Sequence, residues 1–104
     1  MTYIKELQET IRRLHGVESS HVETVPVKES FKGETIWEGE VEVFELYDHP
    51  ETDKLYAWVH EMDDTDNPER HVTVLHIHPI TSPQLAVRAA IIQEYRNRER
   101  PKEN

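Results

Sequence analysis

The sequence contains no cysteine, which excludes disulfide bonds, thiol chemistry and cysteine-ligated metal sites. Glycine is also scarce, with three in the chain, and none of them forms a glycine-rich loop that could hold a phosphate. No apolar run approaches the ~20 residues that cross a bilayer, and the N-terminus lacks the pattern of a signal peptide. We therefore expect a cytoplasmic protein that has no membrane partner.

Basic residues are few beside the acidic ones, with 12 Lys and Arg against 21 Asp and Glu, and the formal net charge is −9. Between Val17 and Thr81 there are sixteen acidic residues and four basic ones. Negative charge of this density repels phosphate backbones, so we expect no nucleic-acid partner. The one basic cluster, at 96–102, is interleaved with glutamates and is typical of a solvated helix end.

Periodicity and turn signals predict a single domain over residues 1–98 and a disordered tail over 99–104. Ile4, Leu7 and Ile11 line one face of a helix, and Ser82-Pro83 is a typical helix start. Pro26 cannot donate a ladder hydrogen bond, which favours an edge position or a late start for the first strand. The expected helices are 2–15 and 82–97, and the expected strands are 21–29, 35–47, 54–62 and 70–78.

These elements predict an α+β fold of order α-β-β-β-β-α. The strands form a four-stranded antiparallel meander, with a three-stranded sheet as the alternative, and the two terminal helices pack on one face of it. Apolar residues surround much of the second helix. Such a helix is expected to be covered on more than one side, by the sheet and the first helix or by a partner subunit.

The order of elements resembles that of double-stranded RNA-binding domains, and the alanine-rich segment 82–90 is similar to their second helix. The resemblance implies a shared topology. Those domains place lysines at the start of that helix to contact phosphates. Here no basic residue precedes Arg88 in the helix, so we do not expect RNA binding.

Side-chain parity lets the register of the sheet be tested for consistency. We expect Glu42 opposite His60, which pairs Phe44 with Trp58, and Trp58 opposite Val74. One face is then apolar and lies under the helices. The other mixes acids, aromatics and imidazoles, and an exposed patch of this kind marks an interaction site. The predicted binding face consists of Phe44, Leu46, Tyr56, Trp58, Val74, Glu38, Glu40, Glu42 and His60.

Candidate chemistry on this face is sparse. His76 and His78 lie two residues apart, as metal-ligating histidines on strands can, but no third ligand converges on them. We therefore predict no metal, no cofactor and no catalytic residues.

The favoured hypothesis is a small non-enzymatic binding or adaptor module, whose partner is a basic protein or a second copy of the chain. The alternative is a small-ligand or metal-dependent enzyme that uses the His- and Glu-lined face. A third hypothesis is an acidic mimic of nucleic acid.

Overall fold

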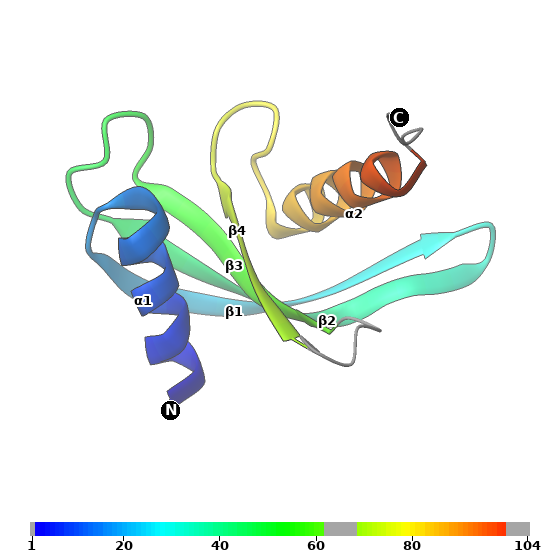
Figure 1. Cartoon of the computed structure of the whole chain (residues 1–104), viewed down its shortest axis with the longest axis horizontal. Coiled ribbons are helices and arrows are strands. Elements are labelled where there is room, and N and C mark those ends of the chain that lie inside the picture. The colour runs from blue at the N-terminus through cyan, green and yellow to red at the C-terminus, as the bar shows by residue number, and fades with distance from the viewer. Residues whose placement is uncertain (1, 62–68, 100–104) are drawn as a thin grey trace, which may run out of the picture.

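The computed structural model describes residues 2–61 and 69–99 and contains two helices and four strands (Figure 1). The elements in order are α1 (Thr2–His15), β1 (Ser19–Phe31), β2 (Glu34–Leu46), β3 (Lys54–Glu61), β4 (Glu69–Leu75) and α2 (Pro83–Glu99). The predicted order is confirmed. Residues 100–104 of the predicted tail lie outside the described residues.

The four strands form one antiparallel sheet in the order β1-β2-β3-β4, so the predicted meander is confirmed. β1 lies at an edge, as Pro26 predicted. The β1–β2 hairpin turns at Lys32 and Gly33, whose φ angles are 53° and 81°. Two consecutive positive φ values suit the two-residue turn that matches the twist of a hairpin.

The predicted register between β2 and β3 is wrong by three residues. Glu42 lies opposite Ala57, and Val43 lies opposite Tyr56. The connection closes early, since Asp48 adopts a φ of 65° and the Leu46 amide donates to the Asp53 carbonyl at 2.9 Å. An odd shift moves every β2 side chain to the other face relative to β3. Between β3 and β4 the error is two residues, with Trp58 opposite Val72, so parity there is preserved.

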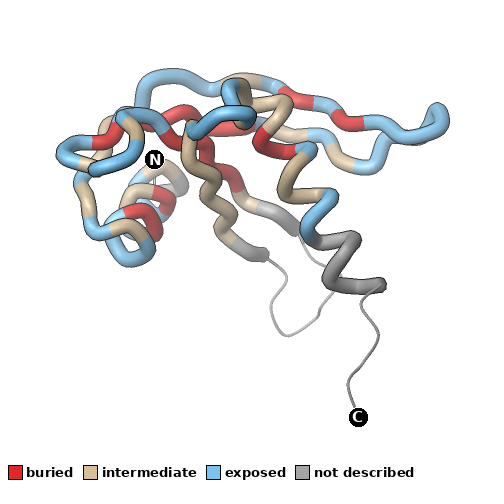
Figure 2. Tube along the Cα trace, turned by 90° about the horizontal axis from the view of Figure 1, so that it is seen from above, coloured by how far each residue is buried: buried red, intermediate tan, exposed pale blue. Residues whose placement is uncertain are grey.

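The two helices lie on opposite faces of the sheet, which corrects the prediction that both pack on one face. Leu7 and Ile11 of α1 pack against a cluster from the face that carries Phe44 and Leu55. Ala86 and Val87 of α2 pack on the other face, which carries Val41, Val43, Val27, Tyr56 and Trp58. In Figures 1 and 2 the β3–β4 hairpin runs between the helices. Both faces are apolar where they meet a helix, so each needs its own cover.

β2 and β3 pair only over Glu42–Glu45, so residues 34–41 of β2 are separated from β3. β1 and β2 continue together as a two-stranded ribbon, which runs past the rest of the sheet (Figure 1). Much of the ribbon is exposed in Figure 2. Phe31 and Ile36 near its tip are 63% and 48% exposed. No helix among residues 2–61 and 69–99 is long and apolar enough to cross a membrane.

Candidate functional site

The predicted binding face does not exist as one exposed surface. Phe44 and Leu46 are buried on the α1 face, while Tyr56 and Trp58 are buried on the α2 face. Val74 packs partly buried on the α2 side. The physical reason is the odd register shift, which separates the β2 residues from the β3 residues with which they were grouped. The apolar residues of the predicted binding face therefore belong to the two cores.

The three predicted glutamates of β2 divide into two exposed and one buried. Glu38 and Glu40 are exposed. The Glu42 side chain is 4% exposed, and its Oε1 lies 2.7 Å from His21 Nε2. Thr24 Oγ1 donates to the same oxygen at 2.5 Å. This carboxylate is the centre of a polar cluster that links β1 to β2. Its two neighbours supply the hydrogen bonds that a buried polar group needs.

The Glu42 cluster does not have the order of a nucleophilic triad. In such a triad the imidazole lies between the hydroxyl and the acid and takes the hydroxyl proton. Here both Thr24 and His21 bind the carboxylate directly, and Thr24 Oγ1 is 3.4 Å from His21 Nε2. The arrangement therefore holds the strands together and does not activate the hydroxyl.

The two histidines with the spacing of metal ligands, His76 and His78, lie in different environments. β4 ends at Leu75, so His76 and His78 follow the strand and do not share a strand face. A hydrogen bond of 2.6 Å joins the Tyr56 hydroxyl to His76 Nδ1, and His78 is exposed. Burial raises the pKa of Tyr56, and the charge of Glu23 raises it further, so the hydroxyl keeps its proton.

His60 lies in β3 opposite Arg70, and its side chain is outside the described residues. Within the described part of the chain, no group of three or more His, Asp or Glu residues is placed to hold a metal ion.

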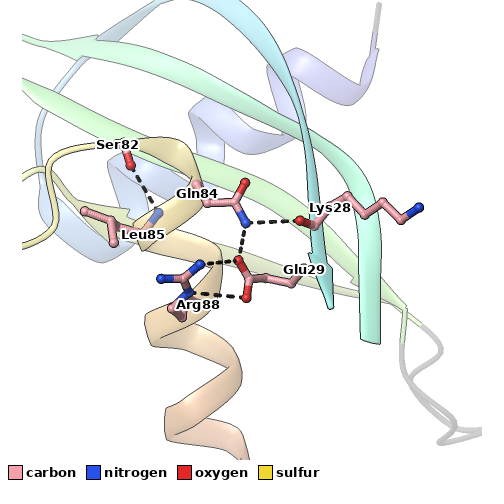
Figure 3. Close-up of polar contacts among 6 residues, drawn as sticks. All are labelled: Lys28, Glu29, Ser82, Gln84, Leu85 and Arg88. Carbon is pink, nitrogen blue, oxygen red and sulfur yellow. Dashed lines mark hydrogen bonds and ion pairs between the residues drawn. The ribbon is translucent and has the colours of Figure 1, made fainter. Parts of the chain in front are cut away.

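A polar cluster attaches the first turns of α2 to β1 (Figure 3). The Glu29 carboxylate is 8% exposed and accepts from Arg88 Nε at 3.3 Å and from Arg88 Nη2 at 3.2 Å. The Gln84 side chain donates to the same carboxylate, and also to the Lys28 carbonyl at 3.1 Å. Ser82 Oγ accepts from the Leu85 amide at 3.2 Å, which caps the helix. These contacts fix which side of α2 faces the sheet.

The opposite side of α2 carries a second apolar row. Ala86, Val87, Ala90 and Ile91 face the core. Leu85, Ala89 and Ile92 follow at i, i+4 and i+7, which places them together on the side away from the sheet. Ile92 is 46% exposed, and Leu85 and Ala89 are partly exposed. We call these three residues the outer row of α2. α1 lies on the other face of the sheet and does not cover it.

The outer row falls within an unusually neutral part of an acidic chain. Residues 70–93 contain no Asp or Glu, although the chain has 21 of them in 104 residues. This segment comprises most of β4, the connection to α2 and the first eleven residues of α2. Like-charge repulsion is therefore weakest at the surface that exposes the outer row.

The separation of the faces had a signal in the sequence. Residues 55–59 of β3 form the continuous apolar run Leu-Tyr-Ala-Trp-Val, which is typical of a strand buried on both sides. The alternation of Glu38, Glu40 and Glu42 with apolar residues is the stronger local pattern, and extended to β3 it predicts one buried and one exposed face for this run.

Comparison of the chain with protein-family models, with curated proteins and with solved structures returned no match.

Proposed function

We propose that this protein is a small non-enzymatic binding module that acts by protein–protein contact, and that the partner at α2 is a second copy of the chain. The outer row of α2 is the observation that carries the proposal. It is apolar, it faces away from the core, and it lies in the segment without acidic residues. Exposed apolar rows on helices are typical of contact surfaces.

A second copy suits this surface because an isologous contact pairs a patch with itself. On any acidic patch, pairing of two chains with a net charge of −9 would place like charges together. The outer row avoids this. Ala89 lies at its centre, and a small residue lets two helix axes approach closely.

The expected dimer is weak. The outer row provides three partly exposed side chains, whereas a stable interface buries about 800 Å² per partner. We therefore expect a dissociation constant on the order of 10–100 μM.

The Ile92→Glu variant should lose the dimer, since a carboxylate from each copy would then enter the apolar contact. Gln93→Glu is the matched control, because it adds the same charge at the neighbouring exposed position outside the row. Sedimentation equilibrium over a concentration series should show self-association for the wild type and for Gln93→Glu, and a monomer for Ile92→Glu. A wild type that stays monomeric at about 1 mM, or equal weakening by both substitutions, would contradict the proposal.

A further inference from the structure

Over residues 34–41, one edge of β2 has no strand beside it in the part of the chain that the structure describes. β1 pairs with β2 along the whole ribbon, from Ser19–Leu46 to Phe31–Glu34, but β3 pairs with β2 only over Glu42–Glu45. Among residues 2–61 and 69–99, no strand pairs with residues 34–41 on the side away from β1. We call this the free edge of β2. It is eight residues long and lies where β3 and β4 have turned away (Figure 1).

Two hydrogen bonds determine which residues present backbone groups at the free edge. The Leu46 amide donates toward β3, to the Asp53 carbonyl at 2.9 Å, whereas the Tyr47 amide donates toward β1, to the Glu18 carbonyl at 3.0 Å. Backbone direction alternates along an antiparallel strand. From Glu38 to Leu46, above the register irregularity of β2 between Thr35 and Trp37, the even-numbered residues therefore direct N–H and C=O away from β1. Within the free edge these residues are Glu38 and Glu40. Pro26 opposite Glu40 fits this parity, because no donor is needed between them.

The same two residues carry exposed carboxylates. Glu38 and Glu40 point to the α1 face, as Glu42 does, and lie two residues and about 7 Å apart along the strand. The other face of the edge differs. Gly39 has no side chain there, and the indole of Trp37 leans over it, so that a Cβ at Gly39 would lie 2.9 Å from the ring. The edge thus offers charge on one face and an aromatic ring on the other.

We propose that the free edge of β2 binds an extended segment of a basic partner as an added strand. Its backbone pairs with the free groups of Glu38 and Glu40. Its lysine or arginine side chains, at alternate positions, lie beside the two carboxylates, and its intervening apolar side chains lie over Trp37 and Gly39. This site lies apart from the outer row of α2, and its test does not depend on the outcome of the dimer test.

A second copy is the wrong occupant for this edge. Antiparallel pairing of two identical edges would bring Glu38 and Glu40 of one copy opposite those of the other, and like charges directly opposite destabilise a strand pair. The acids therefore select a basic strand and reject the chain's own edge.

The outer edge of β1 differs from the free edge of β2, because it carries features that hinder the addition of another strand. β1 carries Pro26, an exposed lysine at 28 and a register irregularity between His21 and Glu23. Proline, lysine and bulges are the devices that prevent strand addition. The free edge of β2 has neither proline nor lysine from Glu34 to Val41. Its one register irregularity lies between Thr35 and Trp37, and the pairing with β1 is regular from Trp37 to Val41, the part that carries Glu38 and Glu40. It is open to a strand in a way that β1 is not.

The test uses the peptide acetyl-Lys-Val-Lys-Val-Lys-Val-amide, titrated into the ¹⁵N-labelled full chain. We expect the amide signals of Glu38 and Glu40 to shift, with saturation below about 1 mM peptide. The acidic counterpart, with glutamate in place of lysine, should not bind. Two N-methylated peptides, one modified on the lysine amides and one on the valine amides, test backbone pairing. Since only alternate amides of an added strand face the edge, at least one of the two must lose binding.

The Glu38→Lys, Glu40→Lys double variant should bind the basic peptide about tenfold more weakly, because two attractive pairs become repulsive ones. Glu45→Lys is the control, an exposed glutamate of β2 within the segment paired with β3. Circular dichroism confirms that each variant is folded.

Four results would overturn the proposal. One is the absence of any shift at about 1 mM peptide. Another is undiminished binding of both N-methylated peptides, which is attraction without strand pairing. A third is an equal loss of affinity in Glu45→Lys. The fourth is a concentration-dependent shift of the Glu38 and Glu40 amides without peptide, which identifies a second copy as the occupant.

Discussion

His15, the last residue of α1, has a lowered pKa because burial disfavours its charged form and His49 adds like charge. The two rings lie 6.1 Å apart, and His15 Nε2 is 3.1 Å from Thr73 Oγ1 of β4. The neutral ring therefore joins the end of α1 to the sheet, and protonation weakens that junction.

This lowered pKa predicts a pH dependence of stability. The unfolded chain binds a proton at His15 near its ordinary pKa of 6.5, before the folded chain does. The contribution to the free energy of unfolding is thus complete above pH 6.5 and is lost as the pH falls through that value to the folded pKa. Urea unfolding at pH 7.5 and at pH 5.5 should show a smaller loss for His15→Gln than for the wild type. Equal losses would contradict this assignment.

Individual residues also show where a local pattern predicts structure. Pro26 predicted an edge strand and Ser82-Pro83 predicted a helix start, and both are confirmed. Each depends on the backbone chemistry of the residue itself. The placement of Glu42 could not be read in this way, since its burial depends on Thr24 and His21 across the strand pair.

At the scale of elements, α2 is oriented by the polar cluster at Glu29. This carboxylate is 8% exposed, whereas the Arg88 side chain is 54% exposed and can be hydrated when released. Glu29 therefore contributes mainly through hydrogen bonds that its buried oxygens receive.

The Glu29→Ala variant should lower the free energy of unfolding by about 1–3 kcal/mol, because it removes hydrogen bonds to a charged acceptor and leaves Gln84 without that partner. Glu34→Ala is the control, as Glu34 is an exposed glutamate near the tip of the same ribbon, and it should change the value by less than about 0.5 kcal/mol. Urea unfolding measures both. A change in Glu29→Ala no larger than the control would show that apolar packing alone orients α2.

The connection between β2 and β3 decided which residues form each core. Its closure at Leu46 and Asp53 set a register that differs by three residues from one chosen to pair Phe44 with Trp58. Cross-strand aromatic pairs are worth about 0.2–1 kcal/mol. The full burial of Phe44 under α1 and of Trp58 under α2 is worth about 1.5–3 kcal/mol for each side chain. The free energy gained by burying both side chains, one on each face, therefore exceeds that of a single cross-strand aromatic pair.

At the scale of the whole molecule, charge is distributed unevenly. The ribbon and its free edge carry exposed glutamates, while residues 70–93 carry none. The two proposed contacts follow this division, with a basic strand at the acidic edge of β2 and a second copy at the neutral outer row of α2. Each partner is matched to the local charge and not to the net charge.

Solubility should fall between pH 7 and about 5. Protonation of the seven histidines moves the formal net charge from −9 to −2, and a chain near neutrality repels its copies less. Precipitation by polyethylene glycol across this range measures the effect. The control is His78→Glu, which places a negative charge at an exposed position where the wild type gains a positive one on acidification. At about pH 5 this variant should precipitate at a higher polyethylene glycol concentration than the wild type. Solubility that does not change with pH would contradict the prediction.

Local sequence patterns were enough to predict the elements, their order and the meander, because helix periodicity, turn residues and proline act over a few neighbouring positions. It also determined the acidic character of β2, which stands in the alternation of Glu38 and Glu40 with their neighbours. Three features follow from long-range packing and could not be predicted in this way: the helices cover opposite faces, Tyr56 and Trp58 are core residues, and β2 has a free edge. All three depend on the register between β2 and β3, which is set jointly by the connecting turn and by the packing of the two cores. A shift of one residue in that register moves every β2 side chain to the opposite face relative to β3.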